Sequence, residues 1–107
     1  MTVMVEPVPG TQVIYEYLSS CGHVEKTYPP NTTLFVTLAV ECAMLTAYGS
    51  ISKLVVVENH GVLYLGNWNS FAHVEEVVIR STDGFVAITE SVGSLEIQSL
   101  TGGSVEI

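Results

Sequence analysis

The feature that most constrains this fold is a glycine followed by apolar residues at the second and fourth places after it. The pattern begins at Gly61, Gly84, Gly93 and Gly103. At the third of these, a two-residue period places Leu95 and Ile97 on one face of a strand and Glu96 on the other. We interpret each glycine as the turn residue that restarts a strand. The second half of the chain is therefore predicted to consist of short, half-buried strands.

The first half also favours strands, because it is rich in β-branched and aromatic residues. Outside the glycine-led segments at 84–88, 93–97 and 103–107, we expect strands at residues 13–18, 23–28, 32–40, 54–57, 62–65 and 76–80. Residues 41–48 have a helix-forming composition, but so short a helix is marginal, and we interpret the segment as a strand that Gly49-Ser50 closes. The predicted fold class is all-β.

Two architectures fit this series of strands. Asp83-Gly84 lies between alternating apolar runs and is a strong hairpin signal, and Asn59-His60-Gly61 and Gly102-Gly103 offer two more turns. Three hairpins predict an antiparallel β-sandwich or barrel. In the alternative, the glycines at 84, 93 and 103 mark successive sides of a β-solenoid whose rungs stack.

The run VEEVVIRSTDGFVAITESVGSLEIQSLTGGSVEI resembles the adhesin-type β-solenoid domains of unknown function, and the earlier VEKTYPPNTTLFVTLAV is similar to their lead-in segment. The resemblance implies a parallel solenoid with a surface or adhesive role, and it transfers no site residues. The chain lacks the regular Gly-Asp steps of that family, and the gap from Gly61 to Gly84 interrupts the rung spacing. We favour the solenoid, with the sandwich or barrel as the close alternative.

The length of the chain predicts a single domain over residues 1–107, with residues 1–10 as an N-terminal arm because of Pro7, Pro9 and Gly10. Eleven acids against three Lys and Arg residues give a net charge of −8, which argues against a nucleic acid or an anionic membrane surface as partner. We find no membrane-spanning segment and no signal-peptide pattern. An extracellular, surface or virion location is nevertheless the one we favour.

Four residues are the candidates for a metal site. Cys21 and His23 place a thiol and an imidazole on the same face of an extended segment, and His73 and Glu75 form the same His-x-Glu spacing as His23 and Glu25. Zinc and iron bind such donors where they converge. Because no two histidines lie close together on one strand, we predict no metal and no other cofactor, and interpret the histidines as surface or turn residues.

The two cysteines, Cys21 and Cys42, allow three interpretations. They can pair across neighbouring strands, coordinate a metal, or serve as small buried apolar side chains. Burial as apolar side chains is the interpretation that we take as the default. A catalytic thiol is not expected, because an acidic chain surrounds Cys21.

The candidate binding residues are those of one loop, Asn67, Trp68, Asn69 and Phe71. A tryptophan between amides on a polar loop can stack on a sugar or on an apolar patch of a partner. The alternative is that Trp68 folds back over the core. We assign no catalytic residue, because we recognise no catalytic motif in the sequence.

The sequence thus predicts a non-enzymatic module with an adhesive, structural or assembly role, whose partner is another protein or a further copy of itself. A self-assembling virion or filament subunit is one alternative, and a small metal-dependent β-barrel enzyme or ligand-binding protein is another. Strands at residues 2–5 and 104–107 would leave unpaired edges, which template pairing with another chain. We therefore expect an oligomer or filament formed by strand edges.

Overall fold

The computed structural model describes residues 7–66, 72–88, 92–98, 101 and 103–106. This part of the chain contains strands and turns but no helix, so no helix in it is long and apolar enough to cross a membrane. The strands are β1 (Gln12–Leu18), β2 (Gly22–Tyr28), β3 (Thr32–Leu38), β4 (Ala43–Asn59), β5 (Val62–Leu65), β6 (Ala72–Ile79), β7 (Phe85–Ile88), β8 (Val92–Ile97) and β9 (Ser104–Glu106). The all-β prediction is confirmed.

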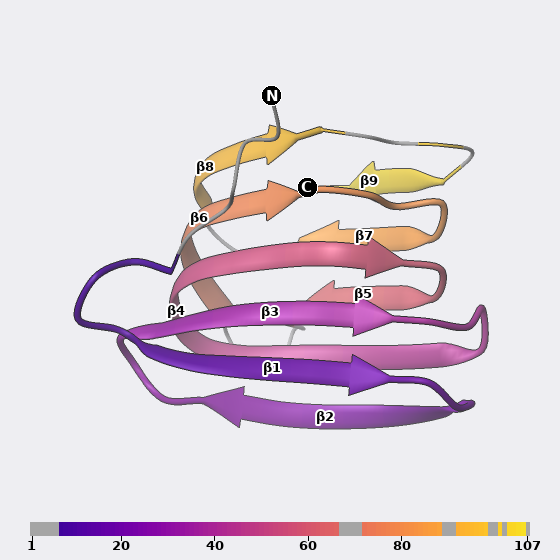
Figure 1. Cartoon of the computed structure of the whole chain (residues 1–107), viewed down its shortest axis with the longest axis horizontal. Helices are drawn as coiled ribbons and strands as arrows, with labels where there is room; N and C mark the ends of the chain where they lie inside the picture. Colours follow the sequence, from indigo (N-terminus) through magenta and orange to yellow (C-terminus); the bar gives the residue numbers. More distant parts are fainter. Residues whose placement is uncertain (1–6, 67–71, 89–91, 99–100, 102, 107) are drawn as a thin grey trace.

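The strands stack into two parallel sheets that face each other, as a β-solenoid of about four turns. Sheet 1 contains β1, β3, the second half of β4, β6 and β8, whereas sheet 2 contains β2, the first half of β4, β5, β7 and β9. The strands of sheet 1 point one way and those of sheet 2 the other (Figure 1). We call each level of the stack a layer, from β1 and β2 in the first to β8 and β9 in the last.

The hairpins of the antiparallel alternative are wrong. Asn59-His60-Gly61 carries the chain from β4 in sheet 1 to β5 in sheet 2, and Asp83-Gly84 carries it from β6 to β7 in the same way. Each of these turns crosses between sheets and leads to a parallel pairing with the layer below. Two residues with hairpin propensity serve equally well at the corner of a solenoid, so local sequence alone could not separate the two architectures.

The strand that we expected to end at Gly49-Ser50 continues through both residues. β4 pairs with β2 in sheet 2 up to Gly49 and then enters sheet 1, where it pairs with β3 from Lys53 onward. Gly49 has a φ of 102°, a conformation that side chains disfavour. The glycine therefore bends the strand from one sheet into the other instead of ending it.

The turns of the solenoid differ in length, which explains the irregular glycine spacing. Gln12 pairs with Thr32, 20 residues later (32 − 12). Val62 pairs with Phe85, 23 residues later (85 − 62), and Val74 with Val92, 18 residues later (92 − 74). The long interval between Gly61 and Gly84 is therefore one complete turn and does not break the repeat.

The glycines at the corner that leads into sheet 2 are required by close approach between layers. A Cβ atom added to Gly84 would lie 2.2 Å from the carbonyl oxygen of Gly61, and one added to Gly103 would lie 2.1 Å from that of Gly84. Neither Gly84 nor Gly103 is among the residues with positive φ. These glycines do restart strands, but the reason is steric contact with the backbone of the preceding layer.

The core is built from columns of side chains that run along the stack. The sheet 1 register aligns Ile14, Leu34, Leu54, Val77 and Leu95, and the sheet 2 register aligns Val24, Leu45, Leu63, Val86 and Val105. The middle three members of each column are fully buried, whereas the first and last are only half-buried. The two ends of the stack are therefore where the core approaches solvent.

Candidate interaction surface at the ends of the stack

The exposed large apolar side chains of the described residues lie on the first and last layers. Val13, Tyr15 and Tyr17 on β1 are 39%, 73% and 67% exposed, and Ile97 on β8 is 42% exposed. Single exposed apolar residues are ordinary, but a group of them at strand edges is typical of an interaction site. This distribution makes the terminal layers the candidate functional surface.

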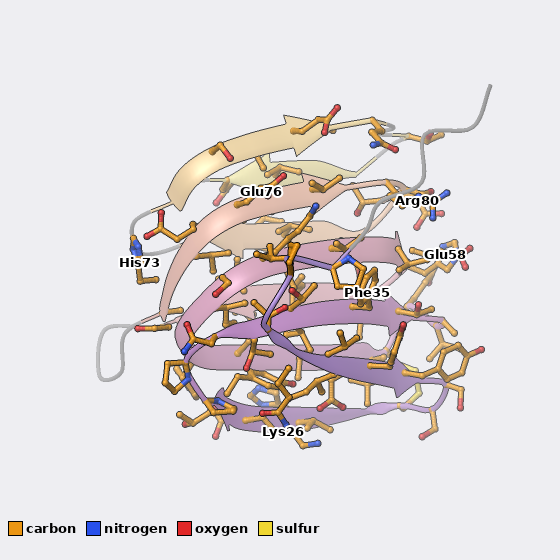
Figure 2. The ribbon with its side chains drawn as sticks, turned by 60° about the vertical axis from the view of Figure 1, so that its left-hand side comes forward. Lys26, Phe35, Glu58, His73, Glu76 and Arg80 are labelled. Atoms are coloured by element: carbon orange, nitrogen blue, oxygen red, sulfur yellow. A yellow bond between two sulfur atoms is a disulfide. The ribbon has the colours of Figure 1, made fainter. Side chains whose placement is uncertain are left out.

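On β1 these side chains form a stripe on the outer face of sheet 1. Val13, Tyr15 and Tyr17 alternate with Ile14, Glu16 and Leu18, which point into the solenoid. The ring of Tyr15 stacks on that of Phe35 in the next layer, with centroids 5.0 Å apart. Figure 2 shows Phe35 on the outer face of sheet 1. The stacking fixes one edge of the stripe and leaves most of the Tyr15 ring in solvent.

The interior of the first layer is polar at one position. Glu16 aligns with Val36, Val56, Ile79 and Ile97 along sheet 1, so its carboxylate points into the solenoid. Lys26 places its Nζ 2.8 Å from Glu16 Oε1, and the Tyr28 hydroxyl donates a hydrogen bond to the same oxygen at 3.0 Å. Burial, followed by the charge and the hydrogen bond of Glu16, raises the pKa of Tyr28.

This polar group closes the core at the first layer. The Glu16 side chain is 11% exposed and that of Lys26 is 52% exposed, so the ion pair reaches from the core to the open end. Figure 2 shows Lys26 at that end of the stack. Inward-pointing charges are one way in which proteins discourage indiscriminate pairing at a sheet edge. A partner at this end must therefore offer hydrogen bonds or opposite charges to Glu16 and Lys26.

A disulfide between Cys21 and Cys42 fastens the first layer to the second, with Cα atoms 4.6 Å apart. Both residues are exposed and lie at the corner that leads into sheet 2. The expectation that they are small buried apolar side chains is therefore wrong. The register explains the pairing, because Gly22 stacks on Ala43 and sets the preceding residues one above the other. The separation of the two cysteines in the sequence could not reveal their pairing, because the length of a solenoid turn was not known from the sequence.

The last layer has a different chemistry. Leu95 and Val105 are half-buried members of the core columns, and Ile97 occupies the position that Glu16 holds in the first layer. The charged side chains on the described residues of β8 and β9 are Glu96 and Glu106. This end thus presents apolar core positions flanked by negative charge.

A charged group outside these two ends links the third and fourth layers. His60 Nδ1 lies 2.8 Å from Asp83 Oδ1, and His60 Nε2 lies 2.6 Å from Glu58 Oε1. Ionised carboxylates only accept hydrogen bonds, so this arrangement favours the form of His60 in which both ring nitrogens carry protons and the imidazole is positively charged. The hydrogen bonds to Glu58 and then Asp83 raise the pKa of His60. Sequence reasoning missed this group, because its members come from two layers that only the fold brings together.

We expect His60 to stabilise the fold at acidic pH. Its folded pKa lies above the ordinary value of 6.5, so the stabilisation is fully present below pH 6.5 and is lost as the pH rises through the folded pKa. NMR titration of the His60 ring will give a pKa above 6.5. The difference in unfolding free energy between wild type and His60→Gln will shrink at alkaline pH. Titration of His60 at or below 6.5 would contradict this assignment.

The proposed metal ligands do not converge. Cys21 is held in the disulfide, and His23 Nε2 lies 2.8 Å from Thr46 Oγ1. His73 Nε2 lies 2.6 Å from Glu75 Oε1, at the opposite corner of the solenoid from Cys21. Across the described residues, no group of three or more His, Cys, Asp or Glu side chains is arranged to hold a metal ion. The structure therefore assembles no site from these four residues.

The other predicted site residues lie outside the part of the chain that the structure describes. They are Asn67, Trp68, Asn69 and Phe71, and the Trp68 loop therefore stays a prediction. The same holds for the strand edge expected at residues 2–5. The edge expected at residues 104–107 corresponds in part to β9. At the other end of the described chain the open edges belong to β1 and β2. The alternation of Val13, Tyr15 and Tyr17 is the sequence signal for the edge at β1.

Comparisons with protein-family models, with curated proteins and with solved structures found no match. The likeness to adhesin-type solenoids is thus a likeness of sequence pattern. Any functional conclusion has to come from the surface of this chain itself.

Proposed function

We propose that this chain is a non-enzymatic assembly module that joins further copies of itself through a terminal layer of its stack. One observation carries the proposal: Val13, Tyr15, Tyr17 and Ile97, the exposed large apolar side chains of the described residues, all lie on end strands. On those strands, one edge has no partner strand in the described chain. Free backbone groups beside apolar side chains favour strand addition.

The disulfide supports an extracellular or surface location for such a module. Disulfides persist in oxidising compartments and are rare in the cytosol. Cys21 and Cys42 are exposed, so a reducing environment would have access to them. An assembly module outside the cell would keep its first layer fastened to the second.

Sedimentation velocity over a concentration series tests the proposal. We expect the wild-type protein to associate as its concentration rises. The double variant Tyr15→Ser with Tyr17→Ser is expected to associate only at higher concentrations than wild type. Tyr64→Ser is the matched control, because Tyr64 is a half-buried tyrosine on the outer face of a middle layer. Circular dichroism confirms that each variant is folded. A wild type that stays monomeric throughout would overturn the proposal.

A further inference from the structure

We propose that two copies join through their first layers about a two-fold axis parallel to the strands, so that β1 of each copy pairs antiparallel with β2 of the other. This arrangement rests on the proposed function and specifies its geometry. Its occupant is a second copy of this chain. Each possible end-to-end contact would bring a different set of charged side chains together, and these sets distinguish the contacts.

Head-to-tail stacking in the register of the solenoid brings unfavourable groups together. Glu25 aligns with Thr46, Tyr64, Ala87 and Glu106, so a first layer placed on a last layer would set Glu25 against Glu106. Like charges at adjacent positions are destabilising. In the same stack, Ile97 would meet the Glu16 carboxylate, which gains no opposite charge there. Both conflicts argue against a continuous head-to-tail filament.

Contact between two last layers is also unfavourable. The described residues of β8 and β9 contribute Glu96 and Glu106 from each copy and no positively charged side chain. Four carboxylates would then share one small interface. The first layer instead carries both signs, since Glu16 points inward beside Lys26. Electrostatic complementarity therefore favours contact between two first layers.

The geometry of the first layer makes it complementary to itself. β1 and β2 run in opposite directions on facing sheets (Figure 1), and Glu16 lies level with Lys26. A two-fold rotation about an axis parallel to the strands exchanges the sheets without moving any residue along its strand. Glu16 then lies beside Lys26 of the partner subunit, and by symmetry Lys26 lies beside Glu16 of the partner subunit. The contact would bury both charges, and each gains a second opposite charge, as a desolvated pair requires.

Neighbouring positions match in the same register. Because the paired strands are antiparallel, the residue two positions after Glu16 lies beside the residue two positions before Lys26 of the partner subunit. Leu18 therefore lies beside Val24 of the partner subunit, and the two side chains continue the apolar core. On the outer face, Tyr15 lies beside Thr27 of the partner subunit. Tyr17 lies beside Glu25 of the partner subunit, whose carboxylate can accept a hydrogen bond from the tyrosine hydroxyl. The exposed tyrosines thus become contacts between strands.

Cysteine cross-linking tests this register. Residues opposite each other in an antiparallel pair have Cα atoms within the range that a disulfide spans. Tyr15 and Thr27 lie on opposite outer faces of one copy, so thiols placed there cannot meet within a chain. We expect the double variant Tyr15→Cys with Thr27→Cys to be converted mainly to covalent dimers on mild oxidation. Peptide mapping will find the two introduced thiols joined to each other, with Cys21 still bonded to Cys42.

Control variants make the outcomes distinguishable. Thr37→Cys with Tyr64→Cys places two thiols on the outer faces of middle layers and is expected to give no covalent dimer. If Tyr15→Cys alone forms the dimer, β1 pairs with β1 and the proposed axis is wrong. If wild type associates in sedimentation but the double variant does not cross-link, the register is overturned while the assembly function stands. A wild type that is monomeric overturns both.

Discussion

Replacing Gly84 with alanine will lower the free energy of unfolding by about 3 kcal/mol, the upper part of the range for overpacked sites. The new Cβ atom would lie 2.2 Å from the carbonyl oxygen of Gly61 and 2.9 Å from the carbonyl carbon of His60. Both atoms are backbone of the preceding layer, so no side chain can rotate away. The parallel ladder holds the two layers about 4.8 Å apart, and relief requires that the layers separate.

Urea denaturation of wild type and Gly84→Ala measures this loss, and Gly10→Ala is the matched control. An added Cβ atom at Gly10 meets nothing within 4 Å, although the φ of 82° makes alanine unfavourable there by about 1 kcal/mol. The control thus reports the cost of glycine conformation without a steric clash. Equal losses of unfolding free energy in Gly84→Ala and Gly10→Ala would mean that close approach between layers does not explain why glycine occupies position 84.

Removing the disulfide will have an effect of similar size. Cys21 and Cys42 are separated by 21 residues, and closing a loop of that length restricts the unfolded chain by about 3 kcal/mol. The double variant Cys21→Ser with Cys42→Ser should therefore unfold at a clearly lower urea concentration than oxidised wild type. The first layer depends most on this bond, because among the described strands it is stacked on one side only and its core side chains Ile14 and Val24 are half-buried.

Reduction provides the control for the disulfide. Adding a reductant should lower the stability of wild type to that of the serine variant and should leave the serine variant unchanged. When the disulfide is reduced, the rate of backbone amide hydrogen exchange should rise first in β2, which the bond fastens to β4. Unfolding of the reduced and oxidised wild type at the same urea concentration would show that the loop closure contributes little.

The first layer combines stabilising contacts with the proposed assembly surface. The ion pair of Glu16 and Lys26 closes the core at the first layer, and the disulfide holds that layer in place. The exposed stripe on β1 is therefore presented by a strand that is fixed from inside and at its corner. A preorganised edge loses less conformational entropy on binding than a mobile one. This is why we place the assembly surface at the first layer.

Local sequence determined the strand content of this protein. β-branched and aromatic composition located the strand beginning near Val13. Alternation with a two-residue period indicated which side chains share a face in the strands beginning near Thr32 and Val62. The glycines at 61, 84 and 103 marked the corners correctly. These properties depend on neighbours along the chain, so one sequence is enough to predict them.

Only the tertiary structure decided how the strands pair. Asp83-Gly84 is compatible with a hairpin or with a solenoid corner, and the contact of Gly84 with the layer below selects the second. The disulfide and the group formed by Glu58, His60 and Asp83 unite residues about one turn apart. Because turn length varies from 18 to 23 residues, that alignment is set by packing between layers, which no local pattern encodes.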